Sequence, residues 1–113
     1  MARRDRIHIG ELKEGKSHGK GRQSWPDGEI YDGGWRNDKR HGYGIYIFSD
    51  GTKYAGGWKD SKKQGHGRQT WPDGEVYDGG WMDDLRHGNF RHTYPNGYTY
   101  DEEWHYGERQ GNY

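Results

Sequence analysis

Residues 54–76 read YAGGWKDSKKQGHGRQTWPDGEV, and this stretch is one complete unit of a 23-residue repeat. A tyrosine opens each unit, a tryptophan follows four residues later, and glycines recur at the same interval. The repeated positions are Tyr31, Tyr54, Tyr77 and Tyr100, then Trp35, Trp58, Trp81 and Trp104, and Gly42, Gly65 and Gly88. A fixed period of roughly 20–50 residues is typical of repeat architectures, so the repeat itself determines the fold.

The repeat accounts for almost all of the 113 residues, which suffice for one domain. Three units are complete, the first is degenerate with His8 and Leu12 in its aromatic positions, and the last is partial. The predicted units are 8–30, 31–53, 54–76, 77–99 and 100–113. Residues 1–7 are expected to form an N-terminal tail, and residues 8–113 a single repeat domain.

Each unit is predicted to form an antiparallel β-hairpin. Residues 42–48 are aromatic and β-branched around two glycines, Ser49-Asp50-Gly51 supplies a turn, and residues 52–58 return. Asp-Gly between two such runs is a strong hairpin signal, and glycine recurs too often for a helix. We therefore expect an all-β, elongated, single-layer array of hairpins, about 45–50 Å long for strands about 4.8 Å apart.

Alternation along the strands predicts two different faces of this sheet. One face receives Gly44, Tyr46 and Trp58, whereas Tyr43 and Lys53 lie on the opposite face, which is mostly polar in the other units. Only 27% of the residues are apolar, against about 45–50% in ordinary domains, but the chain has 21 Gly, 10 Tyr and 6 Trp. The core must therefore consist of aromatic rings packed against glycine backbone.

Composition also excludes several classes of protein. Zero net charge disfavours a nucleic-acid binder, and the absence of cysteine excludes disulfides and thiolate metal sites. No apolar stretch approaches the roughly 18 residues of a membrane span, and the basic start is followed by no apolar segment typical of a secretory signal. We expect a cytoplasmic protein.

The order Tyr-x-Gly-x-Trp, a charged segment, Gly-x-Gly and an Asp-Gly turn resembles the MORN repeat (membrane occupation and recognition nexus) over residues 8–113. Phe90, Glu102 and Glu103 depart from the pattern by replacing glycines. The resemblance implies an open, twisted antiparallel sheet with a groove along it. It also implies an adaptor at membranes, the cytoskeleton or cilia, acting through lipid head groups or a bound partner helix.

The aromatic stripe is the first candidate site. A single sheet has no second layer to cover its rings, and exposed apolar surface usually marks an interaction site. The candidate groove residues are Tyr31, Trp35, Tyr54, Trp58, Tyr77, Trp81, Tyr100 and Trp104. They indicate a non-catalytic scaffold that binds a helix or an extended segment of a partner protein, or a second copy in a homodimer. Carbohydrate stacking on exposed tryptophan is a third alternative.

The charged segments after each tryptophan are the second candidate site. Repetition stacks these segments, expected to be loops, along one edge of the rod, which favours contact with anionic phospholipid or phosphoinositide. The candidate residues are Lys39, Arg40, Lys62, Lys63 and Arg86. The same segments contain Asp38, Asp60 and Asp83, so a solvated rim is the alternative. This hypothesis places the protein at the periphery of a membrane or the cytoskeleton.

No catalytic residues, metal site or cofactor are predicted. An active site needs unlike groups converging on one reacting atom, whereas a repeat places like groups about 10 Å apart. The histidines show no His-x-His or His-Glu-x-x-His spacing. The protein is therefore not expected to be an enzyme.

Overall fold

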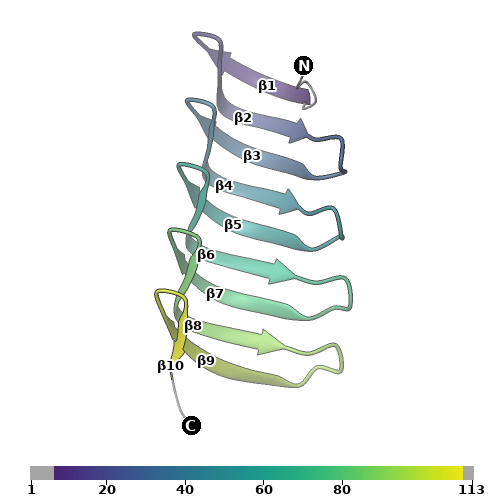
Figure 1. The fold of residues 1–113 in the computed structure, drawn as a ribbon, viewed down its shortest axis with the longest axis vertical. Coiled ribbons are helices and arrows are strands. Elements are labelled where there is room, and N and C mark those ends of the chain that lie inside the picture. Colours follow the sequence, from purple (N-terminus) through teal and green to yellow (C-terminus); the bar gives the residue numbers. More distant parts are fainter. Residues whose placement is uncertain (1–6, 111–113) are drawn as a thin grey trace.

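The computed structural model describes residues 7–110 as one open antiparallel sheet whose strand order follows the sequence (Figure 1). The strands are β1 (Ile7–Lys13), β2 (Lys16–Ser24), β3 (Ile30–Arg36), β4 (Lys39–Ile47), β5 (Lys53–Lys59), β6 (Lys62–Thr70), β7 (Val76–Met82), β8 (Leu85–Thr93), β9 (Thr99–His105) and β10 (Glu108–Gln110). The described residues contain no helix and extend over 50 × 25 × 23 Å. The expected all-β array of hairpins is confirmed.

Two kinds of turn alternate along the sheet. The Asp-Gly turns are where the sequence predicts them, and the Gly51 N–H donates to the Phe48 carbonyl at 2.9 Å. The six-residue loops expected after each tryptophan are instead two-residue turns such as Asn37-Asp38, with φ of 51° and 67°. Positive φ at both positions defines a turn whose twist matches the strands, so most of each charged segment is strand.

The ends of the array extend the expected units slightly. Strand β1 begins at Ile7, one residue before the predicted first unit. Residues 1–6 of the expected tail lie outside the described residues, as do the last three residues of the partial unit. The described part of that unit forms β9 and β10.

Each Gly-x-Gly pair has two distinct roles, shown by Gly65 and Gly67. Gly65 has φ of 82° and lies where the β5–β6 register shifts, between Gly56 and Trp58. Gly67 lies under the Tyr54 ring, and a Cβ there would come within 2.5 Å of the ring carbon Cε1. The shift bends the paired strands, and the bare glycine lets the ring lie flat on the backbone.

The tips formed by the two-residue turns are bonded to one another. The Ser61 N–H donates to the Arg40 carbonyl at 3.0 Å, and the Arg40 N–H donates to Ser61 Oγ at 3.1 Å. Asp84 and Lys63 repeat this exchange at 3.0 and 2.7 Å. The tips therefore form a continuous column along the rod, which is visible beside the sheet in Figure 1.

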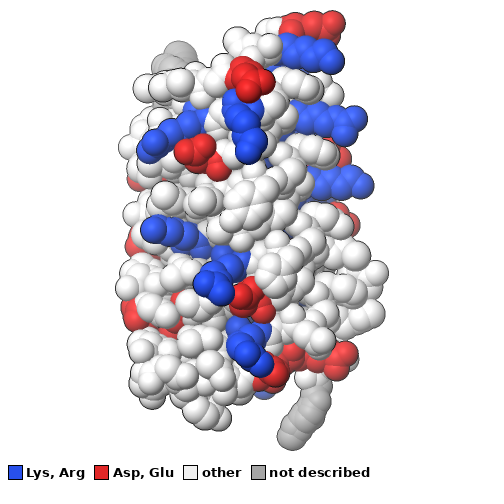
Figure 2. All heavy atoms as spheres, turned by 180° about the vertical axis from the view of Figure 1, so that it is seen from behind, with Lys and Arg blue, Asp and Glu red and all other residues white. Residues whose placement is uncertain are grey.

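The face that we call the outer face carries alternating charges. Figure 2 shows basic and acidic side chains in a line along the long axis, interrupted by an uncharged zone. Arg68 pairs with Asp78 at 2.9 Å, and Arg91 pairs with Asp101 at 3.0 Å. In the uncharged zone Tyr43 is 62% exposed. The prediction of a largely polar second face holds, with apolar exceptions at Tyr43 and Ile45 in the middle and at Ile7 and Ile9 on β1.

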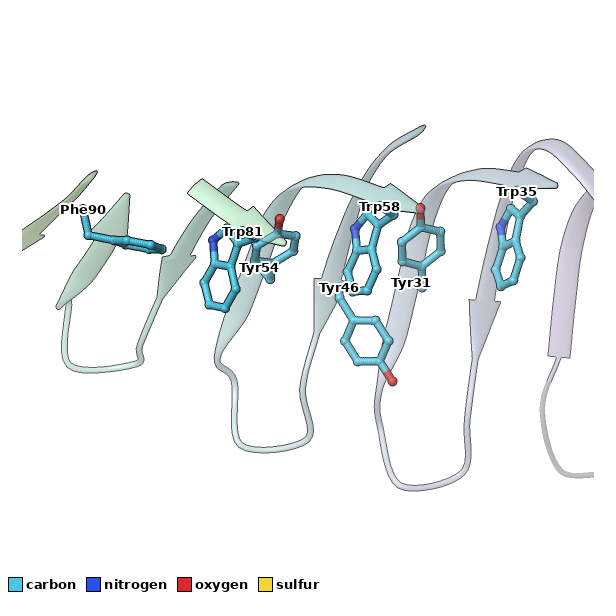
Figure 3. Packing of buried hydrophobic residues seen from close by; sticks show 7 residues of the cluster. All are labelled: Tyr31, Trp35, Tyr46, Tyr54, Trp58, Trp81 and Phe90. Atoms are coloured by element: carbon cyan, nitrogen blue, oxygen red, sulfur yellow. The ribbon is translucent and has the colours of Figure 1, made fainter. Parts of the chain in front are cut away.

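The opposite, inner face carries the core. Figure 3 shows its buried rings in a row along the rod. The Tyr54 ring packs edge-to-face between Trp58 and Trp81, with centroids 5.2 and 5.5 Å away. The Trp58 indole N–H donates to the Gly44 carbonyl at 3.2 Å. Every unit thus contributes rings that pack against the next unit, as a quasi-one-dimensional repeat requires.

This packing predicts unequal costs for removing the same side chain at two positions. Trp58 is buried between neighbours on both sides, whereas Trp104 is partly exposed near the end of the described sheet. Trp58→Ala should lower the free energy of unfolding by about 3–5 kcal/mol, and Trp104→Ala by clearly less. Denaturant unfolding of both variants measures the difference, and equal losses would contradict the stacked-unit core.

Candidate binding faces

The eight candidate groove residues divide into a core set and a surface set. Five of them are buried, namely Tyr31, Trp35, Tyr54, Trp58 and Trp81. Tyr77, Tyr100 and Trp104 keep part of their surface. Tyr31 and Tyr54 have no exposed surface, so these rings form the core beneath the inner face and cannot touch a ligand.

A row of cations lies over these rings. The end of Arg40 is 4.7 Å from the Trp58 ring centroid, Lys63 Nζ is 4.6 Å from Trp81, and Arg86 is 4.7 Å from Trp104. Each cation belongs to the repeat unit that precedes the unit of the ring it covers, so the row links successive units. Cations over aromatic faces at these distances are attracted by the ring quadrupole.

The row is partly withdrawn from water. Burial lowers the pKa of Lys63, the charges of Arg86 and Arg40 act in the same direction, and Asp84 opposes them. Arg40 donates from Nη2 to the Ser61 carbonyl at 3.0 Å, while its Nε is buried with no partner among the described residues. These groups would gain from a negative charge placed above them.

A second aromatic row lies at the Asp-Gly side of the inner face. Its members are half-buried and recur at the same period, being Trp25, Phe48, Trp71 and Tyr94. Trp25 stacks on Tyr46 at 5.8 Å, and Phe48 lies 4.7 Å from the same ring. The period of 23 marked these positions in the sequence, but the candidate set did not include them. With the cation row they form the accessible surface of the inner face.

The unit 77–99 departs from the others in its core. Phe90 replaces the glycine that would lie under Tyr77, and its ring is buried with its centroid 5.4 Å from that of Trp81. His92 is 7% exposed, with Nε2 2.8 Å from Glu75 Oε1 and Nδ1 3.0 Å from Tyr100 Oη. The Phe90 ring fills the space that, in the neighbouring units, is occupied by a tyrosine ring lying over glycine.

The candidate lipid-binding residues also divide. Lys39 and Lys62 are exposed at the tips, whereas Arg40, Lys63 and Arg86 turn onto the inner face. Further exposed cations join the two lysines across the turns, which makes a tip strip of Lys13, Lys16, Arg36, Lys39, Lys59 and Lys62. The carboxylate of Asp38 lies in this strip but accepts the Ser17 N–H at 2.6 Å.

The described residues hold no group of three or more His, Cys, Asp or Glu side chains arranged to bind a metal ion. Within residues 7–110, no helix has the length and apolar character needed to cross a membrane. One shallow hollow lies at a tip, beside Lys59, Lys62 and Asp83. Another, of about 530 Å³, lies on the outer face and is lined by His66, Asp78, Gly79, Asn89, Phe90, Arg91 and Asp101.

The geometry defines a class of protein: a rod of stacked β-hairpin repeats with two extended faces. The MORN repeat family model matches residues 8–30, 31–53, 54–76 and 77–97, so the chain belongs to the MORN repeat family. These bounds agree with the first three sequence units and with the start of the fourth; the match ends at residue 97 and does not include the predicted partial unit 100–113. No curated protein matches the chain as a relative.

The buried tyrosines predict a loss of stability in alkali. Burial raises the pKa of Tyr31 to about 12 against the lowering effect of the Arg40 charge, and burial also raises the pKa of Tyr54. Tyrosine in the unfolded chain ionises at a pH of ~10. Because the folded state holds these tyrosines neutral to a higher pH, their contribution to the free energy of unfolding is complete below pH ~10. It is lost as the pH rises through about 12.

Thermal unfolding followed by circular dichroism should therefore show a midpoint that falls across this alkaline window. Tyr31→Phe removes one ionising group and should reduce the fall, although it also loses the bond to the Gly34 carbonyl. An unchanged slope in that variant would contradict the assignment.

Proposed function

We propose that this protein is a non-catalytic adaptor whose inner face binds a partner segment that combines apolar and acidic side chains. The observation that carries the proposal is the row of Arg40, Lys63 and Arg86 over aromatic rings, with Lys63 held at a lowered pKa. Carboxylates would meet this row, and apolar side chains would cover the half-buried second aromatic row.

The period of the repeat restricts the partner. Two strands of about 4.8 Å each place equivalent cations about 10 Å apart. Seven residues of an α-helix rise about 10.5 Å, and three residues of an extended chain span about 10 Å. An acidic residue at every seventh position of a helix would therefore match the cation row. An acidic residue at every third position of an extended segment would match it in the polyproline II conformation, whose threefold turn brings every third side chain to the same face.

Recognition of anionic lipid is the second candidate function, and the exposed tip strip favours it. Six cations lie along one edge of the first three hairpins. Each basic residue near an anionic surface contributes about 1 kcal/mol, and this contribution is screened by salt. The tip strip and the inner face are separate surfaces, so the two functions can be tested separately.

The adaptor function is tested with synthetic peptides in calorimetry and tryptophan fluorescence. A helical peptide with a leucine face and Glu at every seventh position, and an extended peptide with Glu at every third, are compared with versions carrying Lys at those positions. At least one Glu peptide should bind, and its Lys version should not. Lys63→Met keeps the stem over Trp81 but removes the charge, so affinity should fall about tenfold.

Lys62→Met is the matched control, because it makes the same change one residue away at the exposed tip. It should leave peptide affinity unchanged. Equal binding of the Glu and Lys peptides, or equal losses in the two variants, would contradict the proposed role of the inner face.

The lipid function is tested by vesicle flotation with and without phosphatidylserine or phosphoinositide. Lys39→Glu/Lys62→Glu should lower the bound fraction, and high salt should abolish binding. Lys53→Glu changes an exposed lysine at the far end of the strands and should have little effect. Binding that is insensitive to the tip variant would exclude the tip strip as the lipid surface.

A further inference from the structure

We infer that the outer face is a self-complementary surface on which a second copy of this chain packs, with the two rods antiparallel. The proposal concerns the face opposite the inner face and does not depend on the adaptor function. It rests on the order of charges across six neighbouring strands and on the apolar zone at their centre.

One row of directly paired residues crosses the outer face from β2 to β7. In order it consists of Arg22, Asp32, Ile45, Ala55, Arg68 and Asp78. The charges therefore read plus, minus, apolar, apolar, plus, minus along the rod. Ile45 is 38% exposed, and Figure 2 shows the uncharged zone between the charged side chains.

Consider a two-fold axis that runs parallel to the strands, between β4 and β5, midway between two stacked copies. It places this row of one copy opposite the same row of the second copy in reverse order, so that unlike charges face each other. Ile45 then faces Ala55 of the second copy, Asp32 faces Arg68, and Arg22 faces Asp78. Stacked sheets lie about 10 Å apart, a gap that an arginine and an aspartate side chain fill together. The strands of stacked sheets usually cross at an angle of about 30°. Asp32 and Arg68 lie only about 7 Å from the axis, so this rotation shifts them little and leaves Asp32 of one copy within reach of Arg68 of the other.

The neighbouring row is complementary in shape. Lys20 pairs with Gly34, Tyr43 with Gly57, and His66 with Gly80 across adjacent strands. The same axis places each large side chain of one copy over a glycine of the other, so Tyr43 lies on Gly57. The shallow hollow beside Asp78 and Gly79 lies where Arg22 of the second copy arrives.

The apolar zone fixes this register among the alternatives. Moving the axis by two strands, to between β6 and β7, would place Ile45 against Asp101 of the second copy. Parallel rods, related by an axis along the rod, would place like charges opposite one another, which is destabilising. Of these arrangements, the antiparallel one centred on β4 and β5 covers Tyr43 and Ile45 and also pairs the charges on either side of them.

Charge reversal tests the proposal by sedimentation velocity of the full chain at low and high micromolar concentration. The protein should dimerise, and Asp32→Arg and Arg68→Asp should each weaken association about tenfold or more. An equimolar mixture of the two variants should form a heterodimer, because each copy then presents the charge that the other lacks. These positions lie three strands apart in one chain, so only an intermolecular contact explains rescue.

Asp101→Arg is the matched control, since β9 lies beyond the overlap and should leave association unchanged. Tyr43→Ser removes an exposed ring and should weaken dimers even if a charge variant fails to fold, which circular dichroism reports. Lys63→Met should dimerise normally, which separates this result from that of the adaptor test. A monomer at every concentration, a mixture no better than its components, or an equal effect of Asp101→Arg would overturn the proposal.

Discussion

The structure depends on tyrosine rings that lie flat on glycine backbone of the neighbouring strand. A side chain on Gly44 or Gly67 would overlap the ring of Tyr31 or Tyr54, so no other residue leaves room for this contact. The contact buries a large ring without a second layer of structure, which is why a chain with 27% apolar residues has a core. The edge-to-face packing of these rings on successive tryptophans then transmits order from unit to unit.

The sequence predicted the elements that follow from the period and from the alternation of side chains. It did not predict which face Arg40 lies on, because that depends on the number of residues in the turn. The hairpins, the two faces and the length of the rod all follow from repetition. The inward position of Arg40 does not, because a six-residue loop would leave its direction undefined. The two-residue turn at Asn37-Asp38 makes Lys39 and Arg40 strand residues, and strand residues alternate between faces. One lysine therefore joins the tip strip, while the adjacent arginine covers the core.

Phe90 shows how far the repeat tolerates a change in its central contact. Phe90 occupies a position where the other units have glycine, and its ring is buried. Tyr77 therefore cannot lie on bare backbone as Tyr31 and Tyr54 do, and it is partly exposed. The adjacent indole N–H of Trp81 is buried with no partner among the described residues, whereas the matching N–H of Trp58 bonds a glycine carbonyl. Sequence reasoning treated Phe90 as a departure near the end of the array; the structure makes it part of the core.

The division of the rings into a core set and a surface set determines which side chains of the inner face are available to contact a partner. Rings without exposed area cannot supply contact area to a partner, so in the proposed function specificity there must come from the cations above them and from the second aromatic row. A cation over a ring is stabilised by the ring and destabilised by lost hydration, and burial lowers the pKa of Lys63. In the proposed adaptor, a partner carboxylate would offset this loss of hydration once per unit. The energy of such recognition would therefore grow with the number of units engaged, and a partner whose acidic spacing differs from the repeat would lose more with each unit it crosses.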